Sequence, residues 1–351
     1  MAAVDEARAK VANALNAAPN EIYFTSGGTE SDNWAIRGIA EAHAAKGKHI
    51  ITSAVEHHAV LHTLKALEQN GFEVTYLPVD HLGRVSVDDV VRAIREDTTL
   101  VTIMLANNEV GMIQPIREIA REAKKRGVLV HTDAVQAVGA IPVDVKELGV
   151  DALSLSAHKF YGPKGIGALY VRNGLKIGRL LNGGGQERTL RGGTYNTPAI
   201  VGLGYAIEKA TRDLKKNAEY VSALRDRFVE RVLSEIDYVD LNGDVGDGRL
   251  PSNANIGFRY LEGESILFTL DMNGIAVSSG SACSSGSLDP SHVLLAMGIP
   301  AERAHGTIRF SFGKENTFED VDYVVETLKQ TVKKLRSFSP LYSARGGSNV
   351  H

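Results

Sequence analysis

The sequence has little of several features that mark specialised classes of protein. It contains one cysteine among 351 residues, which excludes a disulfide within the chain and agrees with a reducing compartment. Its formal net charge is -3, which gives no reason to expect nucleic acid or an anionic membrane as the main partner. Internal repeats and low-complexity segments are also missing.

Long hydrophobic runs are missing as well. No apolar stretch reaches the roughly 18 residues that a membrane-spanning helix needs. The opening residues, 1–6, are polar and do not resemble a signal peptide. The sequence therefore predicts a protein of the cytoplasm that has no membrane partner.

What is present is typical of an α/β protein. Hydrophobic residues make up 43% of the chain, charged residues 23%, and there are 35 glycines, as in loop-rich globular proteins. Strand and helix patterns alternate from residue 4 to about 205, which favours a mostly parallel sheet covered by helices. The expected strands are 21–25, 49–52, 73–77, 100–105, 128–131, 152–156 and 167–171.

A long helical pattern near 198–234 follows this region and suits a connector between two domains. After it we expect strands near 253–258 and 307–312 and helices near 263–272, 290–297 and 317–336. The predicted organisation is a large domain over 1–205, a smaller α+β domain over 206–343 and a flexible tail over 344–351.

Ligands of such sheets collect at the carboxyl ends of the strands. The first strand, 21–25, runs into Ser26-Gly27-Gly28-Thr29 and then a helical pattern. Glycines permit a tight turn at the helix start, where free N–H groups, the helix dipole and the Thr29 hydroxyl suit a phosphate. A helix capped after a glycine turn, with no ligand, is the alternative.

Two further strands deliver an acid and a lysine. Asp133 follows strand 128–131, where its alternative role is a helix cap. Lys159 follows the apolar strand 152–156, and a buried lysine loses its proton readily and can form a Schiff base. A lysine, an acid and a phosphate turn at one sheet edge are the parts that a pyridoxal 5'-phosphate site needs.

A series of runs, in a fixed order, carries a family resemblance. The chain resembles the cysteine desulfurases of the NifS/IscS type, which have the PLP-dependent transferase fold of the class V aminotransferases. The resemblance extends from about residue 5 to residue 340. The runs are TSGGTESDN, EHHAV, NNEVG, HTDAVQ, SAHKFYGPKGIGALY, GGGQERTLRGGT and SSGSACSSGSLDPSHVL.

The resemblance implies a role for each matching residue. Lys159 would be the Schiff-base lysine, Asp133 would face the pyridine nitrogen, Gln136 the ring oxygen, and His57 would stack on the ring and move protons. The phosphate would be held by Gly28, Thr29, Ser156 and His158. A metal pair formed by His58 and His62 is a rival interpretation, but no third ligand is evident, so we expect no metal.

Substrate and subunit contacts are implied in the same way. Asn108 would lie near the ring and the substrate, and Arg309 would bind the substrate carboxylate with its planar fork. Thr194 would reach the phosphate of a neighbouring subunit, which implies a homodimer.

The implied reaction converts L-cysteine to L-alanine. Cys283 would accept the sulfur as a persulfide and, on a mobile loop over 278–288, offer it to an acceptor such as an iron–sulfur scaffold protein. Because the chain has no second cysteine, the persulfide would have to pass to a partner or a small thiol.

One departure from the family pattern leaves alternatives open. Family members carry a further N-terminal segment before the equivalent of Val4, and this segment is absent here. A catalytically weakened PLP-binding scaffold subunit is therefore an alternative. A selenocysteine lyase on the same fold is another.

Overall fold

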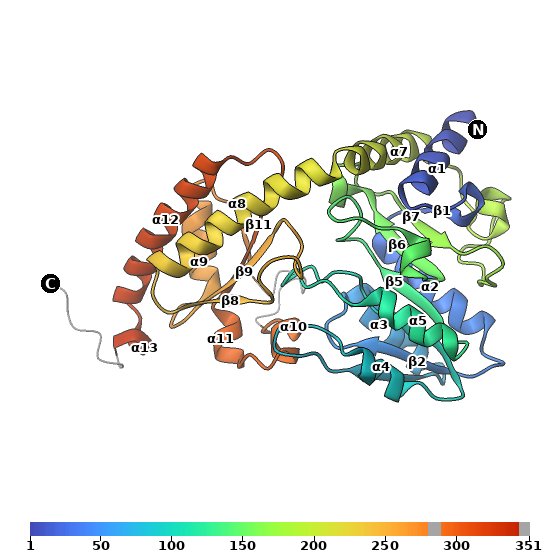
Figure 1. Ribbon diagram of the computed structural model, residues 1–351, viewed down its shortest axis with the longest axis horizontal. Helices are drawn as coiled ribbons and strands as arrows, with labels where there is room; N and C mark the ends of the chain where they lie inside the picture. Colours follow the sequence, from blue (N-terminus) through green and yellow to red (C-terminus); the bar gives the residue numbers. More distant parts are fainter. Residues whose placement is uncertain (280–288, 344–351) are drawn as a thin grey trace. The chain divides into compact units, whose positions relative to one another are not determined.

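The computed structural model describes residues 1–279 and 289–343. The chain divides into two compact units (Figure 1). Unit 1 comprises Met1–Val79, Arg84–Asn108 and Ile113–Lys215, and unit 2 comprises Asp80–Gly83, Glu109–Met112 and the chain from Lys216 onward. Cys283, most of the predicted loop 278–288 and the predicted tail 344–351 lie outside the described residues. Among the helices that the structure describes, none has the length and apolar character needed to cross a bilayer.

Unit 1 is built on a seven-stranded sheet in the order β1-β7-β6-β5-β4-β2-β3. Its strands are β1 Ile22–Thr25, β2 His49–Ser53, β3 Glu73–Leu77, β4 Thr98–Thr102, β5 Leu129–Asp133, β6 Ala152–Ser156 and β7 Gly167–Val171. Strands β3, β2, β4, β5 and β6 are parallel, whereas β7 is antiparallel to β6 and β1. The predicted α/β fold with a mostly parallel sheet is therefore confirmed.

Helices of unit 1 follow most of its strands. They are α1 Ala2–Ala14, α2 Gly28–Ala42, α3 His58–Glu68, α4 Val87–Ala93, α5 Ile116–Lys125, α6 Val145–Leu148 and α7 Thr197–Arg212, with short 3-10 helices η1 Pro19–Glu21, η2 Ala157–Phe160 and η3 Gln186–Thr189. Helix α2 packs on β4 to β7 and buries Trp34 and Ile39 in a shared core. Helix α1 lies close against α7 (Figure 1), where a Cβ on Gly204 would come within 2.8 Å of Ala7.

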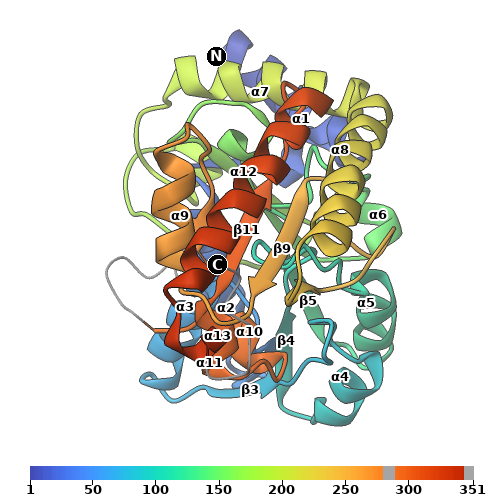
Figure 2. The ribbon, with the colours of Figure 1, turned by 90° about the vertical axis from the view of Figure 1, so that its left-hand side faces the viewer.

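Unit 2 contains a four-stranded antiparallel sheet in the order β10-β11-β9-β8. The strands are β8 Val239–Asn242, β9 Asn253–Phe258, β10 Ser278–Ser279 and β11 Thr307–Ser311. The helices are α8 Leu214–Glu235, α9 Gly263–Asp271, α10 His292–Ala296, α11 Ala301–His305, α12 Phe318–Ser337 and α13 Pro340–Ser343. Figure 2 shows α8, α9 and α12 beside β9 and β11, with which they share one apolar core.

The predicted helix over 198–234 is two helices, α7 and α8, that meet at Asp213. The Thr211 hydroxyl donates to the Ile207 carbonyl at 2.8 Å, and Asp213 ends α7. Hydroxyl groups that bond back to the preceding turn bend helices, and aspartate disfavours a helix interior, so the break has a local cause.

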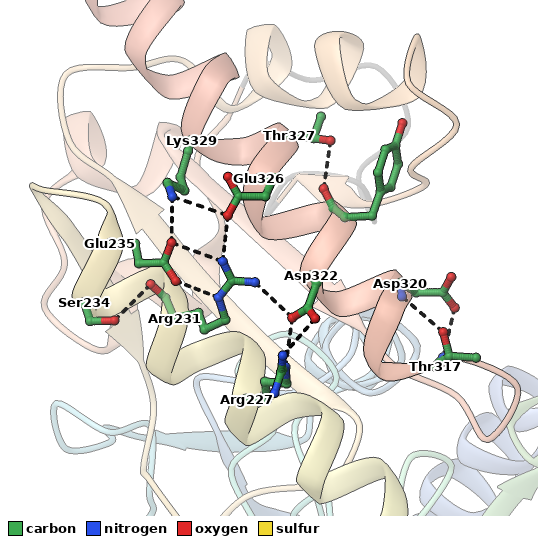
Figure 3. Close-up of polar contacts among 11 residues, drawn as sticks. Arg227, Arg231, Ser234, Glu235, Thr317, Asp320, Asp322, Glu326, Thr327 and Lys329 are labelled. Atoms are coloured by element: carbon green, nitrogen blue, oxygen red, sulfur yellow. Dashed lines mark hydrogen bonds and ion pairs between the residues drawn. The ribbon is translucent and has the colours of Figure 1, made fainter.

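Helices α8 and α12 are joined by a network of ion pairs on the surface of unit 2 (Figure 3). Arg231 is at its centre and contacts Glu235 at 2.6 Å, Asp322 at 2.9 Å and Glu326 at 2.7 Å. Further pairs link Arg227 to Asp322 and Lys329 to Glu235. Because one guanidinium is shared by three carboxylates, the network has a larger effect than isolated surface pairs do.

We expect Arg231→Gln to lower the free energy of unfolding of unit 2 by about 1 kcal/mol at low salt, and by less in concentrated NaCl, which screens the pairs. Scanning calorimetry at the two salt concentrations measures the loss. Lys333→Gln, a charge change on the exposed side of α12, is the matched control. A loss that is the same at both salt concentrations would contradict an electrostatic role.

A buried carboxyl group in unit 1 links the turn after β2 to the segment after β4. The side chain of Glu56 is fully buried; its oxygens accept from the Met104 N–H at 3.1 and 3.0 Å and from the Ser53 hydroxyl at 2.5 Å. Burial raises the pKa of Glu56 to about 8, against the opposing effect of these hydrogen bonds. Glu56 is therefore protonated at neutral pH.

This pKa predicts a pH-dependent stability. Between about pH 4.3, the ordinary glutamate value, and pH 8, folded Glu56 keeps a proton that the unfolded chain has lost. Its contribution to stability is therefore complete below that window and falls as the pH rises through it. We expect the unfolding free energy of the wild type to fall relative to Glu56→Gln, by up to about 1.4 kcal/mol per pH unit, and to level off above the window.

Urea unfolding followed by the fluorescence of Trp34, the only tryptophan and a core residue of unit 1, measures this difference. Glu118→Gln, on the exposed face of α5, should show no such slope. A pH-independent difference between the wild type and Glu56→Gln would show that Glu56 is ionised in the folded protein.

Candidate active site

A glycine turn joins β1 to α2. Gly27 has a φ of 153°, and a Cβ on Gly28 would lie 2.6 Å from Val135 Cγ2, too close for any side chain. A Cβ on Gly27 would be 3.6 Å from Ser156 Oγ, so the turn lies against the end of β6. The first N–H groups of α2, which have no partner within the helix, begin at this turn.

The end of β6 places a histidine and a lysine beside the turn. After Ser156 the chain forms the tight helix η2, which ends at Tyr161 in the left-handed conformation. Within it, His158 and Lys159 are exposed, and His158 Nδ1 lies 2.9 Å from Ser156 Oγ. Partial burial and the positive charge of Lys159 lower the pKa of His158, so the imidazole and the ammonium group are neighbours.

Asp133 is the last residue of β5 and pairs in register with Ser154 of β6. Its side chain is 7% exposed. Burial raises the pKa of Asp133 to about 6, while the Val135 N–H, 2.9 Å from Oδ1, and the Lys159 charge oppose this effect. The charge of Lys159, which follows the adjacent strand, therefore acts on Asp133. Gln136 is half-buried in the turn that follows.

His57 and Asn108 follow β2 and β4 at the same edge of the sheet. His57 caps α3, with Nδ1 accepting from the Ala59 N–H at 3.1 Å, which leaves Nε2 as the nitrogen that carries the proton. Asn108 is half-buried. The preceding Asn107 donates to the Val55 carbonyl at 2.9 Å and so ties this segment to the turn before His57.

The remaining predicted residues lie elsewhere in the described chain. Thr194 is exposed in unit 1, after η3. Arg309 is half-buried on β11 of unit 2, between Asn255 of β9 and Ser278 of β10. The rings of His58 and His62 stack with centroids 5.0 Å apart. Within residues 1–279 and 289–343, no group of three or more His, Cys, Asp or Glu side chains could hold a metal ion.

Two features of the site have no clear signal in the sequence. Asp32 on α2 is 1% exposed, and one carboxyl oxygen lies 3.7 Å from His131 Nε2. Burial and the nearby carboxyl groups of Asp133 and Glu56 raise the pKa of Asp32 well above its ordinary range. In the sequence, the burial of Asp32 is indicated only by its position among the apolar residues of α2. The second feature is an ion pair between Glu30 and Arg191, which are far apart in sequence.

These residues fit pyridoxal 5'-phosphate. The glycine turn at the start of α2 lies against Ser156, whose hydroxyl contacts the His158 imidazole, and the free N–H groups of a helix start suit a phosphate. A buried carboxyl group beside a lysine amine supplies partners for a ring nitrogen and for an aldehyde. All of these groups belong to unit 1.

Comparisons with known proteins agree with this chemistry. The model of the family described as aminotransferase class-V matches residues 1–324. Cysteine desulfurase IscS from Clostridium botulinum is 55% identical over 341 residues, which are 97% of this chain and 86% of that protein. A solved NifS-like protein has a TM-score of 0.89 and 41% identity, covering 95% of this chain and 88% of its own.

A second solved structure, described as SspA in complex with cysteine, has a TM-score of 0.77 and 40% identity, covering 90% of this chain and 88% of its own. The family model and the relatives together span nearly the whole chain. The chain therefore belongs to the pyridoxal phosphate-dependent class V aminotransferase family and, within it, to the cysteine desulfurases of the IscS and NifS type.

Proposed function

We propose that this protein is a cysteine desulfurase that converts L-cysteine to L-alanine and carries the released sulfur on Cys283. The observation that carries the proposal is the placement of the buried Asp133 at the end of β5 beside the end of β6, which leads to Lys159 and lies against the glycine turn of α2. The similarity to IscS and to a protein solved in complex with cysteine supports the choice of substrate.

The residues of unit 1 would hold the cofactor as follows. Lys159 would bind its aldehyde carbon, Asp133 would face its ring nitrogen, Gln136 its ring oxygen, and His57 would stack on the ring. Gly28, Thr29, Ser156 and His158 would bind the phosphate, together with Thr194 of a second copy in the proposed homodimer. When bound, the cofactor supplies an electron sink for the substrate carbons.

Proton transfer would depend on Lys159 and His57. The Lys159 amine would move the proton at the substrate Cα, because a neutral amine beside the substrate can act as a general base. His57 exchanges a proton through Nε2 alone, since the Ala59 N–H occupies Nδ1. Asn108 and Arg309 orient the substrate, Arg309 through its carboxylate.

Sulfur transfer would proceed by attack of the Cys283 thiolate on the substrate sulfur. The new S–S bond forms as the Cβ–S bond breaks, the electron pair stays on carbon, and a proton completes the methyl group of alanine. The persulfide then passes to an acceptor in the cytoplasm, an iron–sulfur scaffold protein being our candidate. The relatives' names favour this function over a scaffold subunit or a selenocysteine lyase.

For the cofactor linkage, we expect Lys159→Ala to abolish the borohydride-reducible bond between protein and pyridoxal phosphate, because Lys159 is the lysine whose charge acts on Asp133. Lys164→Ala, in the exposed turn after η2, is the matched control and should keep the bond. Mass spectrometry of the reduced protein locates the linkage. A bond that persists in Lys159→Ala would refute the assignment.

For the sulfur carrier, we expect Cys283→Ser to abolish sulfide release and alanine formation, while L-cysteine still changes the absorbance of the bound cofactor. The variant lacks the thiolate acceptor but keeps the residues that bind substrate. Alanine and sulfide are measured together, in the presence of a reductant. Unchanged sulfide output would exclude Cys283, and wild-type protein that binds cofactor but forms no alanine would favour the scaffold.

A further inference from the structure

A left-handed turn lies in the segment that leads to Thr194. Glu187, Arg188 and Thr189 are consecutive non-glycine residues with φ of 45°, 55° and 68°. This conformation is costly for residues that have a Cβ, and it persists where the surroundings enforce it. Such strain indicates that contacts with neighbouring elements hold the turn in this conformation.

Buried charges fix the turn on β1 and α1. Arg8 donates to both carboxylate oxygens of Glu187 at 2.8 Å and to the Ile22 carbonyl at 2.7 Å. Both side chains are buried, Arg8 at 7% and Glu187 at 2% exposure. Arg188 donates to the same carbonyl at 2.8 Å, and its guanidinium lies 3.9 Å from the centre of the Tyr23 ring.

The fixed turn delivers Arg191 to the start of α2. Arg191 Nε donates to Glu30 Oε1 at 2.9 Å and Nη2 donates to Oε2 at 3.3 Å. The Glu30 carboxylate also accepts from the Ser26 hydroxyl at 2.5 Å and from the Ser26 N–H at 3.2 Å. Ser26 immediately precedes the two glycines, so the Glu30 carboxylate holds the residue that leads into the proposed phosphate site.

The negative charge of Glu30 bears directly on phosphate binding at the start of α2. Partial burial raises the pKa of Glu30, but Arg191 and Ser26 outweigh it and leave the pKa below its ordinary value. A carboxylate in the first turn of α2 repels a phosphate bound at the same helix start and competes with it for the helix dipole. Arg191 neutralises that carboxylate and directs it toward Ser26.

We propose that Arg191 is a positioning residue for the cofactor phosphate, acting through Glu30: the ion pair removes a repulsive charge from the phosphate turn and holds Ser26, which leaves the N–H groups of Gly28 and Thr29 for the phosphate. The proposal rests on the proposed function, which places that phosphate at this turn. It also explains why a strained turn is maintained in a segment with many glycines.

The test compares cofactor with and without its phosphate. Full-length apo-protein is titrated with pyridoxal 5'-phosphate and with pyridoxal, and the dissociation constants are read from absorbance. We expect Arg191→Gln to weaken pyridoxal phosphate binding by about tenfold, the effect of one charge-assisted pair, and to leave pyridoxal binding unchanged. Glu30→Gln combined with Arg191→Gln should restore the affinity to within about twofold of wild type.

Arg188→Gln is the matched control, because it removes a charge from the same turn without touching Glu30, and it should leave the ratio of the two affinities unchanged. An unchanged ratio in Arg191→Gln would overturn the proposal, as would a double variant as weak as Arg191→Gln, which would mean direct contact of Arg191 with phosphate. Wild-type protein that binds neither ligand would instead refute the proposed function.

Discussion

The buried carboxyl group of Asp133 is the constraint on which the chemistry of unit 1 depends. Burial at the end of β5 disfavours its charge and raises its pKa, and the Lys159 ammonium at the end of β6 opposes that effect. Two further buried acids, Asp32 and Glu56, also have raised pKa values, and that of Glu56, about 8, leaves it protonated at pH 7. Burial thus disfavours negative charge on all three acids, and at Asp133 the charge of Lys159 opposes that effect.

At the phosphate end of the site, the protein has to attract a negative charge rather than suppress one. There the protein offers backbone N–H groups from the glycine turn, and Glu30, a carboxylate in the first turn of α2, is paired with Arg191. Arg191 follows a strained turn, and the buried ion pair of Arg8 and Glu187 keeps that turn in its left-handed conformation. Residues that would not touch the cofactor therefore influence the charge at both ends of the site. They are Asp32 and Glu56 near Asp133, and Glu30 and Arg191 at the phosphate turn.

Much of the fold could be predicted because its signals are local. Strands buried on both faces leave continuous apolar runs, so β2, β6 and β7 lie close to their predicted ranges, and the edge strand β3 does so as well. Gly28, Asp133 and Lys159 were proposed as site residues because each was expected just after the carboxyl end of a strand. Short elements and helix breaks were predicted least well. Strands β8 and β10 have too few residues to show a period, and the break at Asp213 involves only the Thr211 hydroxyl and one aspartate.

The sequence alone determined the alternation of strands and helices, and with it the residues at the strand ends, because a hydrophobic period and a glycine turn are properties of neighbouring residues. It also supplied the ordered runs that resemble one family. Only the tertiary structure decided which charges are buried together: Asp32 with Asp133, Glu30 with Arg191, and Arg8 with Glu187. These pairs join residues distant in the chain, and a pKa depends on burial and on charges brought close by folding.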